Sequence, residues 1–514
     1  MLKALLAYGY LPRELPPLFG SESFASLSKV TAGMPASMTN EKADWTQSIH
    51  HNLARVGGLR RRLTVPNPIN FYRLATAFDK NSAALVAEWK KSPYSHTLPK
   101  ATARGPRGIS SESSDRATAR AHARIGARYL LRADISQFYP SIYTHTIPWA
   151  LHTKKAAKAA FNDMSLAGNV LDRELQACQF GQTKGIAIGP DTSLGIAELL
   201  LAPIDKRLKD ECQILGGVRF IDDMEFSFQR LADAEAALAR LESMLYEYEL
   251  QLNGNKTRIL ELPEILESKY VTELRRYIPH LSAGNTSQWI DYFNHTFVLA
   301  KEHPSAGVLR YAIAALQSVT ATEKCWPIAQ ALLWQCIALD PGCLRFVIDV
   351  LLLHKHRASR VPDATVAQSA IEALIITSAP VGHGSEILWC IWASLQLNLK
   401  LSSNAQQAIA GMDDAFVAVA AMVAIDRSVF AADFESPLWE SWIVEECFKQ
   451  EHWLFAYEAY RWDWFADKVR IAKVHEDPSA KFLVDAGVTF INDKQIDGYL
   501  PKKLVVYGGG GGGY

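Results

Sequence analysis

Two adjacent carboxylates, Asp222 and Asp223, are the side chains of this sequence most suited to chemistry. Residues 217–220 and 224–228 on either side alternate between apolar and polar types, as half-buried strands do, and predict a hairpin with the aspartates at its tip. Aspartate is a poor strand former and neighbouring like charges repel, so a divalent cation is the expected partner of the pair. An ordinary surface turn is the alternative interpretation.

A third carboxylate, Asp134, stands at the end of a predicted buried strand over residues 129–135. An aspartate at a strand end, with an Asp-Asp hairpin about ninety residues later, is typical of a two-metal nucleotidyl-transfer site. Two Mg²⁺ ions roughly 3.5–4 Å apart activate the attacking hydroxyl and stabilise the leaving oxygen in such a site. The order and spacing of the two motifs favour this interpretation over an ordinary strand end and a surface turn.

Two further segments could complete such a site. Residues 184–194 form a predicted loop with Gly185 and Gly189, where the missing Cβ allows a nucleic-acid strand to approach the backbone. Residues 252–257 bring Lys256 back toward the aspartates, where a cation can neutralise or protonate a departing pyrophosphate. Taken singly, the loop is consistent with a plain turn and the lysine with a solvated side chain.

Together these segments resemble the reverse transcriptase family. The resemblance rests on Asp134 with Phe138-Tyr139, the loop from Gly185 to Ser193, the Phe220-Ile-Asp-Asp223 hairpin, and Asn255-Lys256-Thr257. It implies catalysis by Asp134, Asp222, Asp223 and Lys256, two Mg²⁺ ions (or Mn²⁺) bound by the three aspartates with Ile135, and nucleotide contacts from Phe138, Tyr139, Gly185 and Gly189. The aromatic Tyr139 matches the residue that excludes a 2′-hydroxyl, which implies dNTP substrates.

The charge of the chain is distributed unevenly. Its formal net charge is zero, but residues 301–514 carry 18 basic and 24 acidic side chains, and residues 1–300 carry 36 and 30. Basic residues gather before the catalytic strand, and those we expect to contact nucleotide phosphates, by the bidentate geometry of guanidinium or by charge, include Lys100, Arg104 and Arg107. Arg116, Arg120 and Arg124 have the four-residue spacing of one helix face. A solvated helix face is the alternative.

The sequence predicts an α+β fold in two main domains. Residues 1–290 mix helices with short strands and correspond to right-hand-like polymerase fingers and palm, with residues 64–100 arranged around one amphipathic helix. In residues 291–507 apolar helical runs recur about every twenty residues, which predicts an all-α domain of HEAT-like repeats. Nine of the thirteen tryptophans lie there, mostly as predicted core, although some could stack on single-stranded bases. Residues 508–514 form a flexible Gly-rich tail.

Other features bear on the compartment. The seven cysteines are scattered without a Cys-x-x-Cys pair, which indicates free thiols in a reducing environment. The N-terminal apolar run is too short for a signal sequence, and the longest apolar run, residues 415–425, is short enough to predict a core helix. We expect a cytoplasmic protein with no membrane partner.

The palm-plus-helical arrangement resembles, more narrowly, the abortive-infection polymerases of the AbiA/AbiK type, most of all their compact prophage-encoded member. The resemblance implies template-independent DNA synthesis primed by a protein tyrosine, a covalently attached single-stranded DNA product, homo-oligomers, and antiviral defence in a bacterial host cell. Lys184 and Gly189-Pro190 stand where many reverse transcriptases have Gln and Ser-Pro. The neutral charge fits a short or single strand better than a long heteroduplex.

The priming tyrosine has no motif of its own. Tyr8 and Tyr10, in a glycine-flanked N-terminal segment, are the candidates that could swing into the site, with Tyr94 and Tyr143 as rivals. Packing is the alternative role for each. Two other functions remain open: a templated RNA-directed DNA polymerase that copies a dedicated non-coding RNA, and an inactive nucleic-acid-binding scaffold.

Overall fold

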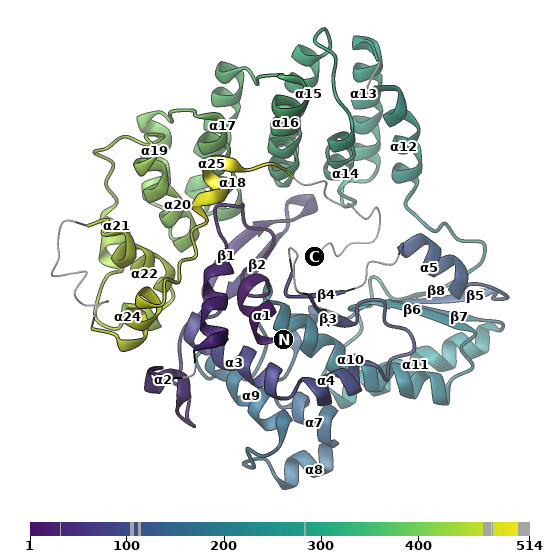
Figure 1. The fold of residues 1–514 in the computed structure, drawn as a ribbon. Coiled ribbons are helices and arrows are strands. Elements are labelled where there is room, and N and C mark those ends of the chain that lie inside the picture. The colour runs from purple at the N-terminus through teal and green to yellow at the C-terminus, as the bar shows by residue number, and fades with distance from the viewer. Residues whose placement is uncertain are drawn as a thin grey trace.

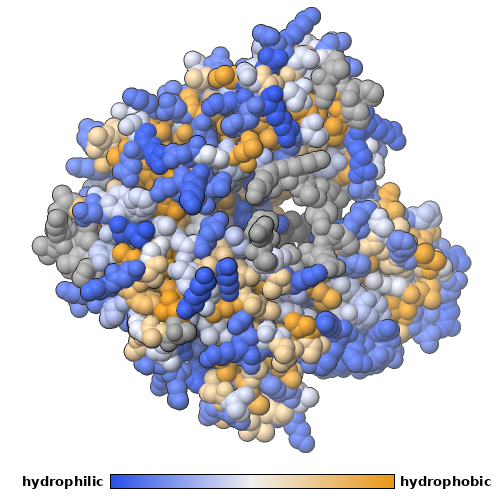
Figure 2. All heavy atoms as spheres, viewed as in Figure 1, coloured by the Kyte–Doolittle hydropathy of each residue, from blue (hydrophilic) through white to orange (hydrophobic). Residues whose placement is uncertain are grey.

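We describe a computed structural model of the chain, covering residues 1–30, 32–102, 107–111, 115–281, 284–465, 474 and 476–501. A mixed region of helices and strands occupies the lower and right part of Figure 1, and an arc of helices curves over its top and left. The space-filling view is hollowed between this arc and the lobe that carries the largest sheet (Figure 2).

The largest sheet is four-stranded and antiparallel, with the order β6-β7-β5-β8. Its strands are β5 (Tyr129–Ala133), β6 (Gly216–Phe220), β7 (Asp223–Phe228) and β8 (Arg258–Glu261). Phe220 pairs with Asp223, so Ile221 and Asp222 form the two-residue turn of the predicted hairpin. Ala133 pairs with Met224, which brings the end of β5, and hence Asp134, beside this turn. The predicted strands and hairpin are confirmed.

Helices cover both faces of the β6–β7 hairpin. On β6, Arg219 contacts α10 (Asp191–Glu211), while Val218 and Phe220 cluster with Ala119 of α5 (Arg116–Ala123), because successive strand residues point to opposite faces. Next to α10, α11 (Leu231–Glu247) packs on β5 and β7. In the sequence, four helices lie between β5 and α10: α6 (Phe138–Ser141), α7 (Thr146–His152), α8 (Lys154–Ala159) and α9 (Ala167–Ala177).

The N-terminal region contains more elements than the sequence predicts. It comprises α1 (Leu2–Tyr8), the 3₁₀ helix Glu22–Lys29, α2 (Ala36–Thr39), β1 (Ile49–Ala54), β2 (Arg60–Val65), α3 (Pro68–Lys80), α4 (Ser82–Trp89), β3 (Pro99–Ala101) and β4 (Ile109–Ser111). The single amphipathic helix expected within residues 64–100 is two helices that meet at Asn81. The antiparallel β1–β2 hairpin was not expected.

The second half of the described chain is helical. Its helices are α12 (Lys269–Leu281), α13 (Thr286–Glu302), α14 (Val308–Ala315), α15 (Trp326–Leu339), α16 (Leu344–Ala358), α17 (Ala364–Ser378), α18 (Gly384–Leu397), α19 (Ser403–Ala410), α20 (Ala415–Asp426), α21 (Pro437–Ser441), α22 (Trp453–Trp462), α24 (Pro478–Asp485) and α25 (Asp493–Gly498). Helices α13, α15, α17 and α19 contact one another in turn, and so do α14, α16, α18, α20 and α22, which makes two layers.

Two details of this region bear on the sequence-based predictions. One of the apolar runs from which this helical domain is predicted covers residues 439–448, and the prediction of a helix there is wrong: α21 ends at Ser441, and Glu446 takes a left-handed conformation that no continuous helix contains. Most tryptophans are core residues as predicted, and those that are buried in this half are Trp326, Trp334, Trp389, Trp392, Trp439 and Trp453. All seven cysteines are free thiols.

One described helical stretch, Ala364–Val381, is long and apolar enough to cross a membrane, with a mean hydropathy of 1.3. It comprises α17 and the 3₁₀ turn that follows, and it packs against α15, α18 and α19 within the two layers. Core helices of other proteins pass the same test. The apolar run of residues 415–425 is α20, which is almost wholly buried, as expected of a core helix.

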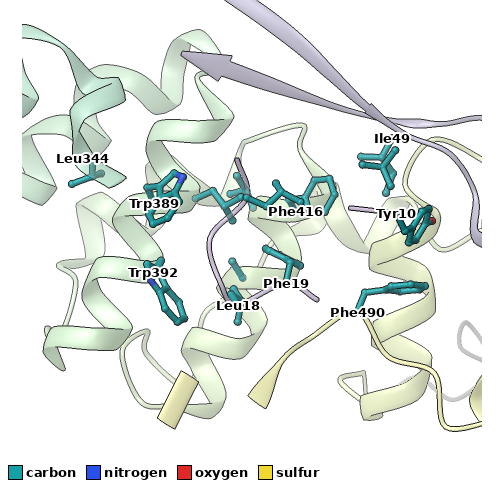
Figure 3. Packing of buried hydrophobic residues seen from close by; sticks show 14 of the residues in the cluster. Tyr10, Leu18, Phe19, Ile49, Leu344, Trp389, Trp392, Phe416 and Phe490 are labelled. Carbon is teal, nitrogen blue, oxygen red and sulfur yellow. The ribbon is translucent and has the colours of Figure 1, made fainter. Parts of the chain in front are cut away.

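The N-terminal segment packs into the helical half (Figure 3). Phe19 lies edge-on against Phe416 of α20, with ring centroids 5.0 Å apart, and Tyr10 contacts Phe490 at 5.5 Å. The β1–β2 hairpin is also attached to this half: Arg60 Nη2 donates to Glu386 of α18 at 2.9 Å. One buried hydrophobic cluster therefore runs through both halves of the chain.

Candidate active site

The turn that carries the two aspartates has a strained residue. Ile221 has φ of +59°, which is unfavourable for a β-branched side chain. Both of its backbone polar groups are held: its N–H donates to Thr97 Oγ1 at 3.0 Å, and its carbonyl accepts from Arg219 Nη1 at 2.9 Å. The surrounding protein thus fixes the conformation from which Asp222 and Asp223 project.

A buried ionic network anchors this clamp. The guanidinium of Arg219, fully buried, donates to both oxygens of Glu198 at 3.0 and 2.9 Å and to Asp205 at 2.7 Å. Thr97 Oγ1 donates to Glu198 at 2.6 Å while accepting from Ile221, and Ser95 Oγ donates to Glu198 at 2.8 Å. Helix α10 is therefore tied to the aspartate turn through Glu198 and Arg219.

Asp134 is held by the segment that returns from α11. The backbone N–H of Asn253 donates to the Asp134 carbonyl at 2.7 Å, and the Asn253 side-chain amide donates to Asp134 Oδ1 at 3.1 Å. Lys256 Nζ donates to Asp134 Oδ2 at 3.0 Å, so the predicted return of this lysine to the catalytic strand is confirmed. Both carboxylate oxygens of Asp134 accept hydrogen bonds.

The three aspartates interact electrostatically. Burial, then the nearby charge of Asp134, and to a smaller extent that of Asp223, raise the pKa of Asp222 to about 6, against the opposing effect of Lys256. A carboxylate in this position favours either a proton or a cation. The repulsion expected of the adjacent pair is therefore present at the turn.

The donor set fits a divalent metal ion, although the side chains are turned to other partners. Among the described residues, no three Asp, Glu, His or Cys side chains converge as a ready-made metal cluster. Asp134 is engaged with Lys256, and Asp223 Oδ2 with two arginines. Mg²⁺ prefers the oxygen atoms of charged carboxylates as ligands. A bound cation would lower the raised pKa of Asp222 by stabilising its charged form. Asp134, Asp222 and Asp223 would hold such an ion; Ile135 is buried and pairs with Leu252.

A bound divalent ion would activate an attacking hydroxyl and stabilise a leaving oxygen. The chain's own residues orient the donors: Asn253 fixes Asp134, and Thr97 with Arg219 fixes the turn of Asp222. Lys256 places a cation beside Asp134, where it would stabilise the negative charge that develops on a leaving group.

The row of arginines before β5 serves two purposes. Arg124 donates to both oxygens of buried Glu225 at 2.6 and 3.0 Å, and Arg132 donates to the same carboxylate at 3.1 Å. Burial alone would raise the pKa of Glu225, but the hydrogen bond and charge of Arg124 lower it. Arg116 and Arg120 instead reach Asp223 Oδ2 at 3.4 and 3.1 Å. The predicted single helix face is confirmed, and its first two members lie at the candidate site.

The aromatic pair and the glycine loop lie close together. Phe138 and Tyr139 are both buried, and Ile186 N–H donates to the Tyr139 carbonyl at 3.0 Å. Gly185 has φ of +86°, and a Cβ there would lie 3.2 Å from the Pro140 carbonyl. At Gly189 a Cβ would lie 2.5 Å from Pro12 Cγ. The atoms that approach these glycines belong to the protein, whereas a nucleic-acid strand was expected there.

Two of the remaining phosphate-binding candidates, Lys100 and Arg107, lie on and beside the β3–β4 pair. Arg107 forms an ion pair with buried Asp191, at the start of α10, and Asp191 also accepts from Ile109 N–H at 2.8 Å. Lys100 is exposed on β3. Arg104 lies outside the described residues. Arg107 is therefore committed to a contact within the protein in this conformation.

The tyrosine candidates differ in accessibility. Tyr10 is fully buried, its hydroxyl donates to the Pro66 carbonyl at 2.6 Å, and its ring packs on Phe71 at 4.5 Å. This contradicts the expectation of a residue free to swing, because its removal would open the core. Tyr8, at the end of α1, is partly exposed. Tyr94 is buried, and Tyr143 is partly exposed.

Several residues of the site were not singled out from the sequence. Asn253 lies within residues 252–257, the segment that carries Lys256, but its residue type indicates only a turn, since asparagine commonly orders one. Thr97 lies far from the motifs in the sequence, and Glu198 follows the glycine loop within a plain helical stretch, so neither carries a signal of its own. The four-residue spacing of Arg116 and Arg120 was recognised, but their contact with Asp223 depends on how α5 crosses the sheet.

Comparison with known proteins agrees with this geometry. Residues 76–292 match the family model of reverse transcriptase (RNA-dependent DNA polymerase). This chain contains a reverse transcriptase domain. The match begins within α3 and ends within α13, so it includes Asp134, the loop with Gly185, the Asp222-Asp223 turn and Lys256. The protein is thus a nucleotidyltransferase, a DNA polymerase of the reverse transcriptase type. No curated protein matches the chain.

Proposed function

We propose that this reverse transcriptase-like protein is a protein-primed, template-independent DNA polymerase that acts in phage defence by abortive infection. Catalysis is assigned to Asp134, Asp222 and Asp223 with Mg²⁺, and to Lys256 at the leaving group. The observation that carries the assignment is the placement of Asp134, at the end of β5, beside the turn of Asp222 and Asp223, where the neighbouring carboxylates help to raise the pKa of Asp222. Polymerases of this type take dNTPs as substrates.

The absence of a template is supported by what fills the space around the site. Pro12 lies against Gly189, where the sequence predicted the approach of a nucleic-acid strand. Helix α5 covers the face of β6 and β7 opposite α10. A paired duplex needs more room than a single strand, so these contacts favour a single strand as the product.

The tyrosine that receives the first nucleotide is assigned to Tyr8, because it is partly exposed and immediately precedes Gly9, whose carbonyl accepts from the Asp191 N–H at 2.8 Å. Tyrosine can attack an α-phosphate once a metal lowers the pKa of its hydroxyl. Tyr143 is the second candidate. Tyr10 is assigned a structural role, in keeping with its burial.

The helical half supports the narrower part of the proposal. Its two layers of successive helices fit a HEAT-like repeat array, in which each unit packs on its neighbours. We assign to it the contacts of a homo-oligomer in the bacterial cytoplasm. Copying of a dedicated non-coding RNA is the second candidate function, favoured by the match to an RNA-dependent DNA polymerase family.

Incubation of the purified protein with Mg²⁺ and labelled dNTPs, without nucleic acid, separates the two candidates. Template-independent, protein-primed synthesis predicts label that migrates with the protein and is removed by nuclease down to a short adduct. Dependence on added RNA would support the templated alternative and refute the proposal. The double substitution Asp222→Ala and Asp223→Ala should abolish labelling while the protein keeps its thermal unfolding transition.

The priming residue is tested in the same assay. Tyr8→Phe should remove the adduct, whereas Tyr143→Phe should leave it in place. Mass spectrometry of the nuclease-trimmed protein locates the attached nucleotide. An adduct of unchanged mass and position in Tyr8→Phe would refute the assignment of Tyr8 but not the polymerase activity.

A further inference from the structure

Arg116 and Arg120 stand apart from the rest of the basic row, because their partner is a candidate metal ligand. Both approach the same oxygen of Asp223, at 3.4 and 3.1 Å. Arg120 also lies 3.7 Å from Glu225, and the Arg116 guanidinium stacks on the Phe220 ring, 4.4 Å from its centroid. Their side chains are largely covered, with 24% and 12% of their surfaces exposed.

The helix that carries them is held firmly on the sheet. Asp115 caps the first turn of α5 by accepting from the Ala117 N–H at 3.1 Å. Ala119 clusters with Val218 and Phe220. At the other end, Arg124 binds Glu225 through two hydrogen bonds and the Glu264 carbonyl at 2.9 Å. The two guanidinium groups are therefore positioned before any ligand binds.

The place of these arginines in the sheet indicates which part of the reaction they face. Lys256 precedes β8, on one side of β5, and contacts Asp134. Helix α5 lies over β6 and β7, on the other side, and contacts Asp223. In nucleotidyl transfer the attacking and leaving oxygens lie roughly in line, on opposite sides of the reacting phosphorus. With the leaving group on the side of Lys256, the arginines lie on the side of the attacking strand.

Charge supports the same conclusion. If Asp223 bound a divalent ion, its carboxylate would attract the two guanidinium groups less strongly. Helix α5 holds these groups in place, so they would need another anionic partner. Guanidinium binds phosphate oxygens in a bidentate geometry and is suited to a partly buried site. The backbone phosphates nearest the 3′ end of a growing strand supply such oxygens.

We propose that Arg116 and Arg120 bind the phosphodiester backbone at the 3′ end of the growing DNA strand, with Asp223 as their resting partner. The inference extends the proposed polymerase function and names the ligand of a site that the motifs do not include. Phosphates of the incoming nucleotide have the same chemistry, so the test must distinguish the two sources.

Binding is measured first, by fluorescence anisotropy of a labelled single-stranded oligodeoxythymidylate in Ca²⁺, which supports binding without turnover. Arg116→Gln with Arg120→Gln should weaken binding at least about tenfold, since the charge-assisted hydrogen bonds of both guanidinium groups to the strand are lost. The slope of log affinity against log salt should fall by about 1.4, or about 0.7 for each phosphate that is no longer neutralised. Arg128→Gln, an exposed residue paired with Glu261, is the matched control and should bind normally.

A second pair of variants tests the role of Asp223. Without metal, Asp223→Asn should tighten oligonucleotide binding several-fold, because the arginines lose their competing anion. Adding the two arginine substitutions to Asp223→Asn should remove this gain. Unchanged binding in both comparisons would overturn the proposal.

Kinetic measurements then distinguish binding of the growing strand from binding of the incoming nucleotide by the two arginines. In the arginine variant, the ratio of elongated product to protein carrying a single nucleotide should fall, since no strand phosphate exists before the first addition. A raised KM for dNTP with an unchanged ratio would assign the arginines to the triphosphate, and an equal reduction of both steps would assign them to the positioning of Asp223. Either result overturns the proposal. The oligonucleotide measurements do not depend on protein priming, so they stand even if synthesis proves to need a template.

Discussion

The protonation of Asp222 depends directly on the burial and the negative charges of the candidate site. Burial and the neighbouring carboxylates of Asp134 and Asp223 raise its pKa to about 6. The folded protein therefore holds this proton more tightly than the unfolded chain does. The stability linked to the proton is fully present below the ordinary pKa of 3.8 and is lost as the pH rises through about 6.

Asp222→Asn should therefore stabilise the protein at pH 8 but not at pH 4. We expect a gain of about 1 kcal/mol at pH 8 in EDTA, less than the full pKa shift would give because the turn is partly exposed. Thermal unfolding at the two pH values measures the difference, and Mg²⁺ should raise the midpoint of the wild type more than that of the variant. Asp210→Asn, at an exposed ion pair with Lys206, is the control. Equal effects of Mg²⁺ on both proteins would contradict a metal role for Asp222.

Individual residues of the candidate site could be predicted from the sequence where the chemistry requires one residue type. The approach of Asp134, Asp222, Asp223 and Lys256 to one another could be predicted, because the order and spacing of the strand-end carboxylates and the returning lysine favour a shared site over separate turns. Asn253 could not be named, because asparagine in a turn usually serves the turn alone. Its hydrogen bond to Asp134 becomes visible only when the chain returns to β5.

The β6–β7 hairpin carries two of the three candidate metal ligands, and its turn is stabilised by contacts from outside the hairpin. Ile221 takes up a left-handed conformation that costs on the order of 1–3 kcal/mol. The hydroxyl of Thr97 joins this turn to Glu198 by accepting from one and donating to the other. Because the clamp acts on backbone atoms, the identity of the turn residue alone does not secure its geometry.

Thr97→Val should lower kcat about 10- to 100-fold and leave the KM for dNTP nearly unchanged, because the turn loses its anchor while the nucleotide contacts remain. Thr97→Ser, which keeps the hydroxyl, should restore activity. Ser95→Ala removes another hydrogen bond to Glu198 and the acceptor of the Thr97 N–H, but it keeps the Thr97 hydroxyl that accepts from Ile221, and it is therefore the control. Steady-state kinetics and thermal unfolding are measured on all three. If Ser95→Ala reduced kcat as much as Thr97→Val at equal stability, the clamp would not be the cause.

Elements with regular patterns were predicted, and elements with mixed patterns were not. The β6–β7 hairpin alternates between apolar and polar residues, so its strands could be assigned. The β1–β2 hairpin carries His50, His51 and three consecutive arginines, which look like a solvated segment. Its strands form because the helical half supplies partners: His51 binds Asp414 at 2.7 Å, and Arg60 binds Glu386.

The molecule as a whole joins a segment near residue 20 to a segment near residue 490. Asn492 N–H donates to the Leu18 carbonyl at 2.8 Å, and Gly20 N–H donates to the Phe490 carbonyl at 3.0 Å. Contacts between segments so far apart in the sequence cannot be anticipated from local pattern. For this reason the sequence alone predicts N-terminal tyrosines that are free to swing into the site. Tyr10 is buried by the same arrangement.

This arrangement predicts that the boundary near residue 290 does not separate two independently folding parts. A chain of residues 1–290 would expose Tyr10 and Phe19 and leave Arg60 without Glu386. Each large apolar side chain exposed costs about 1.5–3 kcal/mol, and the sum over this interface is comparable with a net stability of about 5–15 kcal/mol. We expect the fragment to lack a cooperative unfolding transition by calorimetry, and co-expression with residues 291–507 to restore it.

Phe416→Ala in the full chain provides a graded comparison, with an expected destabilisation of about 3–5 kcal/mol, because its ring contacts Phe19. A fragment that unfolded cooperatively by itself would show that the shared core is dispensable, and that the polymerase half is stabilised by the sheet and its own helices.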